Sequence, residues 1–135
     1  MIYLDSAAII KLVHPGAESR ALDLWLAERA GMPWVSSALA EIEVARAIAR
    51  RAPASQPRVP VVLGSVARLG IGQAVRALAA TYPDPALRSL DAIHIATAQV
   101  LAAELGEPPA AFVTYDRRLL AAAAAAGLTT ACPGC

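Results

Sequence analysis

Short apolar segments without polar alternation are the feature of this sequence that most limits its fold. Isoleucine, valine, leucine and aromatic residues fill them, as in Ile2–Leu4 and Phe112–Val113, and such runs are typical of strands buried on both faces of a parallel sheet. Between them lie segments with helical periodicity and helix-capping residues. Strands that alternate with helices favour an α/β fold. We therefore predict three layers (α/β/α), with helices on both faces of a short central parallel sheet.

The predicted elements follow one another along the whole chain without a repeat or a second domain. Strands are expected at 2–4, 33–36, 69–71, 111–114 and 128–131, and helices at 6–14, 17–30, 37–51, 61–68, 73–82, 90–105 and 116–126. The proline-rich segment 52–60 is expected to be a loop. A chain of 135 residues suits one domain over 1–135, in which residues from about 131 to 135 form a flexible tail.

Composition and charge exclude several classes of protein. Hydrophobic residues make up 57% of the chain and charged residues 17%, which excludes a disordered protein. A formal net charge of +1 excludes a polybasic nucleic-acid-binding tail, so any RNA binding must come from a local arrangement of side chains. Because neither a secretory signal nor a membrane-spanning run is visible, we expect a cytoplasmic protein that does not enter a membrane.

Two cysteines, Cys132 and Cys135, stand close to the C-terminus. One such pair cannot complete a four-ligand zinc site. A redox-active pair normally opens a helix after a strand, whereas this pair follows the last predicted strand. We therefore place both cysteines in the flexible tail and assign them no chemistry.

Acidic residues occur at the ends of predicted strands and near the start of predicted helices. Asp5 follows the first strand, and Asp116 follows the strand at 111–114. In α/β folds ligands bind beyond the carboxyl ends of the strands, which is where both of these acids fall. Asp91 lies in the first turn of the long helix among apolar neighbours, and Glu41 and Glu43 lie on the helix after the second strand.

Carboxylates that converge in apolar surroundings need a cation. Burial penalises an unpaired charge, and neighbouring carboxylates raise one another's pKa. A hard divalent ion such as Mg²⁺ accepts oxygen ligands, keeps several waters and commonly binds one or two carboxylates together with a substrate phosphate. Four acids with one or two such ions would make a phosphodiesterase that activates water.

Each acid also has a purely structural interpretation. Asp5 and Asp116 could cap the helices that follow them, and Asp91 could complement a helix dipole. Glu41 and Glu43 could belong to a solvated helix face. Because they lie two residues apart they point in different directions, and spacing alone does not choose between them.

His94 follows Asp91 by three residues and could share its face of the helix. The simpler interpretation is a packed core histidine, because histidine is intermediate in its preference for burial. The sequence therefore gives His94 no assigned part in the site.

Four sequence blocks stand out along the chain, and the third is the most specific. They are Ile2–Ala8, Ser36–Arg46, Leu87–Ala98 and Phe112–Leu119. The first places a serine after an aspartate, and the second places an arginine three residues after a glutamate. In this order and at this chain length, the blocks resemble the PIN-domain family and, within it, the VapC toxins of bacterial toxin–antitoxin pairs.

The resemblance implies which acids hold a metal ion. Asp5 and Asp91 match the firmest metal ligands of the family, and Asp116 matches its fourth acid. The match selects Glu43 as the remaining ligand, because an arginine follows it by three residues. Glu41 is kept as the alternative acid of the second block.

The resemblance also implies residues that assist these acids. Ser6 and Thr114 would be hydroxyls that orient the carboxylates. Arg46 and Arg117 could hold phosphates, because the arginine fork matches phosphate oxygens. The sequence shows no aromatic platform on which bases would stack, so we name no base-reading residue.

A function and a set of partners follow from the same resemblance. It implies a PIN-like fold, a site for Mg²⁺ or Mn²⁺ and single-strand-specific endoribonuclease activity on RNA. It also implies a homodimer and inhibition by a VapB-type antitoxin. Amphipathic segments at 13–26 and 61–78 could receive a helix of that antitoxin.

Three competing functions remain at the level of the sequence. A phosphatase with an aspartyl nucleophile would have a second aspartate two residues after the first, where this chain has Ala7. A phosphorylated receiver module would need a lysine at a strand end, whereas Lys11 lies within the first predicted helix. A catalytically silent PIN-like module would only bind a partner, and the intact acids argue against it.

Overall fold

A parallel sheet of five strands runs through the middle of the protein in this computed structural model, which describes all residues from 1 to 135. The strand order is β3-β2-β1-β4-β5, and every neighbouring pair is parallel. The strands are β1 (Ile2–Leu4), β2 (Trp34–Ser37), β3 (Val66–Leu69), β4 (Ala111–Val113) and β5 (Thr130–Ala131). The predicted α/β fold with a short central parallel sheet is confirmed.

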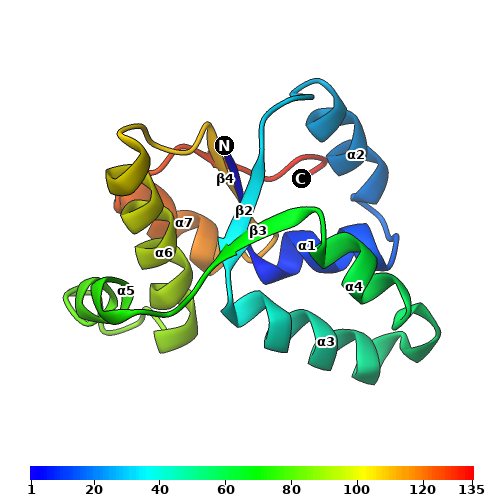
Figure 1. The fold of residues 1–135 in the computed structure, drawn as a ribbon, viewed down its shortest axis with the longest axis horizontal. Helices are drawn as coiled ribbons and strands as arrows, with labels where there is room; N and C mark the ends of the chain where they lie inside the picture. The colour runs from blue at the N-terminus through cyan, green and yellow to red at the C-terminus, as the bar shows by residue number, and fades with distance from the viewer.

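Helices cover both faces of this sheet. They are α1 (Ser6–Val13), α2 (Ser19–Ala27), α3 (Leu39–Arg51), α4 (Arg58–Leu63), α5 (Gln73–Ala79), α6 (Ser89–Leu105) and α7 (Arg117–Ala125), with a short 3₁₀ helix at Pro53–Ser55. In Figure 1, α1 to α4 lie on one side of the strands and α5 to α7 lie on the other. No helix combines the length and the apolar character that crossing a membrane requires.

Side chains of the central strands alternate between two apolar cores. Ile2 and Leu4 are fully buried on the side of α1 to α4. Tyr3, which lies between them, is buried with Ile95 and Phe112 on the side of α6 and α7. Because successive strand residues point to opposite faces, a strand that is buried at every position needs helices on both faces. Burial of each such large side chain contributes roughly 1.5–3 kcal/mol to the stability of the fold.

One predicted helix is wrong in its second half. The helix expected at 61–68 stops at Leu63, and Val66–Leu69 forms β3 instead, so this strand begins three residues earlier than predicted. Gly64 is the cap residue at the end of the helix. Pairing with β2 buries Val66, whose exposed fraction is 3%, and this long-range contact outweighs the local preference of the segment for helix.

The order in which strands are added to the sheet reverses at β1, so the switch point lies between the neighbouring strands β1 and β4. The strands β1, β2 and β3 follow one another outward on one side, whereas β4 and β5 are added on the other side of β1. Leu4 is in register with Val113, so the residues that follow these two strands, Asp5 and Thr114, come together at one edge. In open parallel sheets ligands bind in the crevice at such a switch in strand order.

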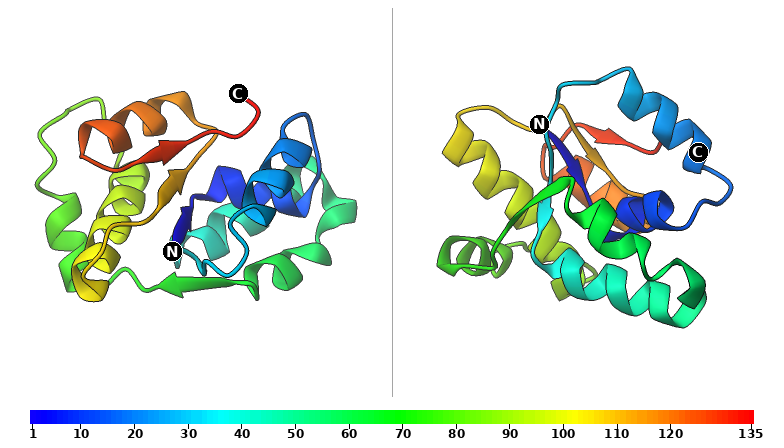
Figure 2. Two further views of the ribbon diagram at one scale, coloured as in Figure 1. Left: turned by 90° about the horizontal axis from the view of Figure 1, so that it is seen from above. Right: turned by 45° about the vertical axis from the view of Figure 1, so that its right-hand side comes forward.

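The C-terminal segment lies beside α2, as Figures 1 and 2 show. The Tyr115 hydroxyl donates a hydrogen bond to the carbonyl oxygen of Pro133 at 2.9 Å, and Gly134 lies so close to Ala21 of α2 that a Cβ atom there would collide with it. Cys132 and Cys135 form a disulfide. The flexibility predicted for residues 131 to 135 stays a prediction, and these are the contacts that would have to open.

Candidate functional site

Asp5 directly follows the central strand β1 and is almost fully buried, with an exposed fraction of 3%. Its Oδ1 accepts a hydrogen bond from the backbone N–H of Ala8 at 2.8 Å, so Asp5, and not Ser6, caps α1. Its Oδ2 accepts a hydrogen bond from the Thr114 hydroxyl at 2.5 Å. The chain therefore fixes both carboxylate oxygens, and each oxygen keeps a lone pair for a further partner.

Burial makes the ionised form of Asp5 costly. It raises the pKa of Asp5 from 3.8 to about 6, and the charge of Glu43 adds to this rise. The nearby His94 and the hydrogen bonds from Thr114 and Ala8 act in the opposite direction but do not cancel it. A carboxylate in this position gains more from a nearby cation than one in water would, because burial has removed its solvation.

Glu43 of α3 is the second acid of this region. Its Oε1 accepts hydrogen bonds from the Ser6 hydroxyl at 2.7 Å and from Nε2 of His94 at 2.8 Å. Partial burial raises the pKa of Glu43, but these two hydrogen bonds together with the nearby charges of His94 and Arg88 outweigh it, and the net pKa lies below its ordinary value. Glu43 is therefore ionised at neutral pH, and its Oε2 has no hydrogen-bond partner within the chain.

His94 of α6 connects this carboxylate to the core. Its ring is buried, and its Nδ1 lies 2.8 Å from the hydroxyl oxygen of Tyr3. Because a carboxylate can only accept, Nε2 donates to Glu43, and a neutral ring then accepts the Tyr3 hydrogen at Nδ1. The sequence-based interpretation of His94 as a packed core histidine thus holds for its burial but missed its contact with the site.

One arginine joins the remaining two acids. Nε of Arg88 donates to Oδ2 of Asp91 at 3.2 Å, and an Nη atom of the same guanidinium donates to Oδ2 of Asp116 at 3.2 Å. Asp116 also caps α7, because its Oδ1 accepts from the backbone N–H groups of Arg118 and Leu119. The Arg88 side chain is 62% exposed, so each of its ion pairs contributes only about 0–1 kcal/mol.

These side chains line one cavity of about 530 Å³ at the carboxyl edge of the sheet. Four carboxylates line it, those of Asp5, Glu43, Asp91 and Asp116. Glu41 does not line it, and instead accepts a hydrogen bond from Arg68 at 2.9 Å outside the cavity. The structure therefore brings Glu43, and not Glu41, to the other three acids.

Of the four residues that the sequence predicted to assist the acids, three lie at the cavity and one does not. Ser6 and Thr114 each donate to a carboxylate of the cavity, and Arg46 is part of the cavity lining. Arg117 is exposed and is not part of that lining, so the structure does not bring it to the acids. The roles of these four residues in binding metal or phosphate stay predictions.

The donor set of this cavity fits a hard divalent cation. All four acids offer carboxylate oxygens, which Mg²⁺ prefers as protein ligands. As arranged, no three histidine, cysteine, aspartate or glutamate side chains form a cluster that could hold a metal ion. Mg²⁺ does not need such a cluster, because it keeps several waters and usually rests on one or two carboxylates. The guanidinium between Asp91 and Asp116 shows that a positive group can be accommodated between these acids.

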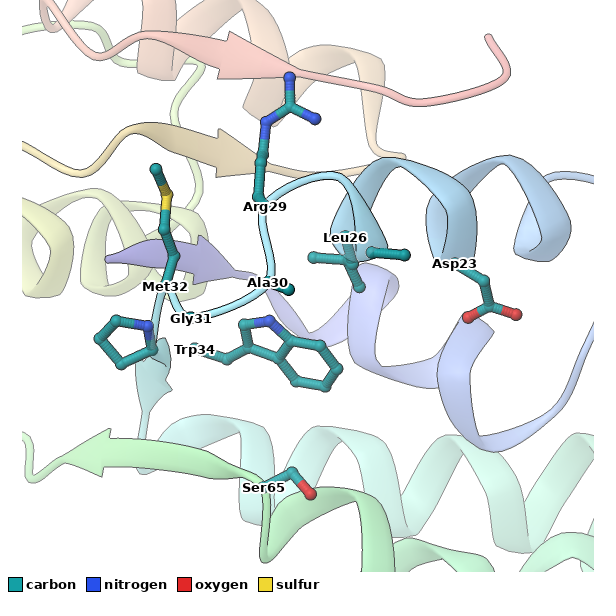
Figure 3. A pocket seen from close by; sticks show the side chains of 10 residues that line it. Asp23, Leu26, Arg29, Ala30, Gly31, Met32, Trp34 and Ser65 are labelled. Atoms are coloured by element: carbon teal, nitrogen blue, oxygen red, sulfur yellow. The ribbon is translucent and has the colours of Figure 1, made fainter.

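A second cavity, of about 470 Å³, lies at the opposite ends of the strands (Figure 3). Trp34 at the start of β2 and Ser65 just before β3 are part of its lining. Figure 3 shows Trp34 between the loop that carries Met32 and the segment that carries Ser65. Asp23 is the only carboxylate of this cavity, so it offers no acidic cluster and we assign it no chemistry.

Two residues of the acidic site were not selected from the sequence. Arg88 precedes Asp91 by three residues, and His94 follows it by three. This spacing places each of them about one turn from Asp91, and it was the available signal. It could not show that Arg88 would also reach Asp116, because that contact depends on how α6 and α7 pack.

Known proteins resemble this chain in sequence and in fold. The sequence model of the PIN domain matches residues 2–125. Ribonuclease VapC35 of Mycobacterium tuberculosis is 48% identical over 134 residues, which cover 99% of this chain and 98% of that protein. Among solved structures, Mycobacterium tuberculosis VapC20 is described as a toxin that cleaves the sarcin-ricin loop. It has a TM-score of 0.68 at 14% identity, and the match covers 96% of this chain and 97% of the VapC20 chain. A chain in the structure of FitAB bound to an IR36 DNA fragment has a TM-score of 0.64 at 18% identity and covers 100% of this chain and 96% of its own.

The parallel sheet with its acid-lined switch point defines an α/β protein with a carboxylate site. The match over residues 2–125 and the relatives at full length then decide its family: the chain belongs to the PIN domain family and is similar over its whole length to the VapC ribonucleases within it. The resemblance inferred from four short sequence blocks is confirmed.

Proposed function

We propose that this protein is a Mg²⁺-dependent endoribonuclease, with Mn²⁺ as an alternative ion, and that it is the toxin of a VapBC-type toxin–antitoxin pair. The observation that carries the proposal is the meeting of four carboxylates from separate parts of the chain, Asp5, Glu43, Asp91 and Asp116, in one cavity. The relationship to proteins named ribonucleases gives the substrate class. Together they favour hydrolysis of RNA phosphodiester bonds.

The acids have distinct parts in this mechanism. Asp5, Asp91 and Asp116 would hold the metal, with Thr114 fixing the orientation of the Asp5 carboxylate. Mg²⁺ bound there would lower the pKa of a water molecule and offset charge on the phosphate oxygens. Glu43 is held ionised, and its unpaired Oε2 can accept a hydrogen bond from the attacking water and so orient it.

We assign the binding of the substrate phosphate to two arginines. Arg46 lines the cavity and makes no ion pair within the chain. Arg88 is paired only through weak, largely exposed contacts, so it can exchange its carboxylates for phosphate oxygens when RNA enters. An arginine fork suits a phosphate because it donates two parallel hydrogen bonds to its oxygens.

The test is cleavage of a single-stranded RNA by the purified protein, freed of any antitoxin, in Mg²⁺, in Mn²⁺ and in EDTA. The Asp91→Asn variant removes one charge from the cavity with little change in shape, and Asp23→Asn at the opposite ends of the strands is the matched control. We expect cleavage that needs a divalent ion, persists in Asp23→Asn and is lost in Asp91→Asn while folding is retained. Cleavage by Asp91→Asn at the wild-type rate would refute the site. A folded protein without any specific effect of divalent ions would favour a silent, partner-binding PIN-like module.

We further propose two protein partners, a VapB-type antitoxin and a second copy of the chain. Leu24 and Val61 have exposed fractions of 58% and 71% and fall in the segments predicted to receive an antitoxin helix. Ile42 and Leu90, at 58% and 49%, leave apolar surface at the rim of the acidic cavity, which a homodimer would cover. Analytical ultracentrifugation of the isolated chain tests the dimer, and copurification with its antitoxin tests the pair.

We place this activity in the cytoplasm, where RNA is present as a substrate. Cytoplasmic reductants keep most protein thiols reduced, so we expect Cys132 and Cys135 to be thiols there. Mass spectrometry of alkylated protein from intact cells distinguishes the thiols from the disulfide.

A further inference from the structure

One face of α3 changes from acidic to basic along its length. Glu43, Arg46 and Arg50 follow one another at intervals of three and four residues, which places them on the same helix face. Arg51 stands next to Arg50 at the end of the helix. All four residues belong to the lining of the acidic cavity, so the basic end of the helix continues the surface that carries the acids.

The three arginines of this face have no carboxylate partner. Arg46, Arg50 and Arg51 are exposed, and none of them takes part in an ion pair. Arg68 and Arg88, in contrast, are both paired with acids. Guanidinium groups that line a cavity without a partner are available to an anion from outside.

The charges of the cavity are separated along its length. Its lining holds four carboxylates and four arginines, and Arg88 is already shared between two of the acids. These formal charges balance in number, but they are separated in space, and the positive charge without an acidic partner lies on the three arginines of α3. Since the whole chain has a net charge of only +1, this face is where a polyanion would be held close to acids that repel it.

We infer that the α3 arginines form a track for the phosphates that flank the cut, with Arg50 and Arg51 holding RNA beyond the nucleotides in the acidic cavity. This inference rests on the proposed ribonuclease function. The helix rises about 1.5 Å per residue, so Arg46 lies about 4.5 Å and Arg50 about 10.5 Å along the axis from Glu43. The step between these arginines is therefore about 6 Å along the helix axis. Because the contacts are to phosphates, the track adds affinity for a longer strand without selecting its bases.

Helix stability alone does not account for this arrangement. Basic residues in the last turn of a helix complement its dipole, and Arg50 and Arg51 occupy that turn. The dipole would be served equally well by arginines on any face. The helix dipole does not require that these arginines line the cavity of the acids. It also does not require that Arg46, in the middle of the helix, lie on the same face.

The experiment compares binding of two fluorescent single-stranded RNAs, a trinucleotide and a dodecanucleotide, by anisotropy in EDTA. The variants are Arg50→Ala/Arg51→Ala, the charge-retaining Arg50→Lys/Arg51→Lys, and Arg20→Ala on α2, an exposed arginine without an ion pair that does not line the cavity. We expect the double alanine variant to bind the dodecanucleotide on the order of tenfold more weakly and the trinucleotide nearly as well as wild type. The slope of log affinity against log salt concentration should be smaller in magnitude by about 1.4 for this variant, since each of the two lost phosphate contacts on a single strand contributes about 0.7. Thermal unfolding of every variant verifies that it is folded.

The outcomes separate this inference from the function on which it rests. If the wild-type protein cleaves RNA but the double alanine variant binds both RNAs as Arg20→Ala does, the track is refuted and the ribonuclease function stands. An acidic protein partner as the true ligand of these arginines would give this same result. If the wild-type protein cleaves no RNA, the length-dependent loss of binding still tests the track, because the anisotropy assay requires no catalysis. The lysine variant should keep the salt dependence of wild type, and its loss would refute a charge-based contact.

Discussion

Substituting Asp5 by asparagine should make the metal-free protein more stable at neutral pH, although it removes an acid of the site. In the folded protein the pKa of Asp5 is raised from 3.8 to about 6 by burial. The folded state therefore binds this proton more tightly than the unfolded chain does. The contribution of protonated Asp5 to the free energy of unfolding is fully present below pH 3.8. It is lost as the pH rises through the window from 3.8 to about 6.

The magnitude follows from this window. A shift of about 2 pKa units corresponds to about 3 kcal/mol of lost stability above pH 6. Asparagine carries no charge and escapes this loss. Its amide nitrogen cannot accept the Thr114 hydrogen bond that Oδ2 of Asp5 accepts, which costs about 1 kcal/mol. We therefore expect Asp5→Asn to be about 2 kcal/mol more stable than wild type at pH 7.5 and no more stable than wild type at pH 4.

The assay is urea unfolding in EDTA, followed by circular dichroism and by the fluorescence of the two tryptophans, at pH 4 and at pH 7.5. Taking the difference between variant and wild type at each pH removes the effect of all other titrating groups. Asp23→Asn, an exposed aspartate at the other ends of the strands, should show nearly no difference at either pH. An equal difference between Asp5→Asn and wild type at both values of pH would show that folding does not raise the pKa of Asp5.

Two further predictions concern residues that contact the acids. Arg88→Ala should tighten Mn²⁺ binding, measured by calorimetry, by about two- to thirtyfold, because it frees two carboxylates from ion pairs of about 0.2–1 kcal/mol each; unchanged or weaker binding would contradict this. His94→Ala should lower the free energy of unfolding by about 2–3 kcal/mol, because it leaves a cavity and a Tyr3 hydroxyl without its partner. The same variant should also reduce cleavage by releasing Glu43, and an effect on stability alone would mean that His94 does not position that acid.

Positions that depend on strand ends could be predicted from the sequence. Asp5 and Asp116 stand just after buried apolar runs, and parallel strands bring their carboxyl ends to one edge, so local pattern and general topology were sufficient. Asp91 was found for a similar reason, because an acid among apolar residues in the first turn of a helix is unusual unless it has a partner. These three acids do line one cavity in the structure.

Positions that depend on how helices pack could not be predicted in this way. Glu41 and Glu43 differ only in the direction they take from α3, and the rotation of that helix is set by the apolar residues that it buries, such as Val44 and Ile48. The bridge from Arg88 to two acids likewise needs the relative placement of α6 and α7. Local preference failed altogether at Val66, where pairing with β2 decided the structure.

The central claim is that the four carboxylates of the cavity bind a divalent ion, and anomalous diffraction from a crystal soaked in Mn²⁺ tests it most directly. We expect a peak in this cavity, on at least one oxygen of Asp5, Asp91 or Asp116, with Arg88 displaced from between the last two. A crystal in which Mn²⁺ binds elsewhere, or nowhere, while the same protein cleaves RNA would show that these carboxylates are not the metal site.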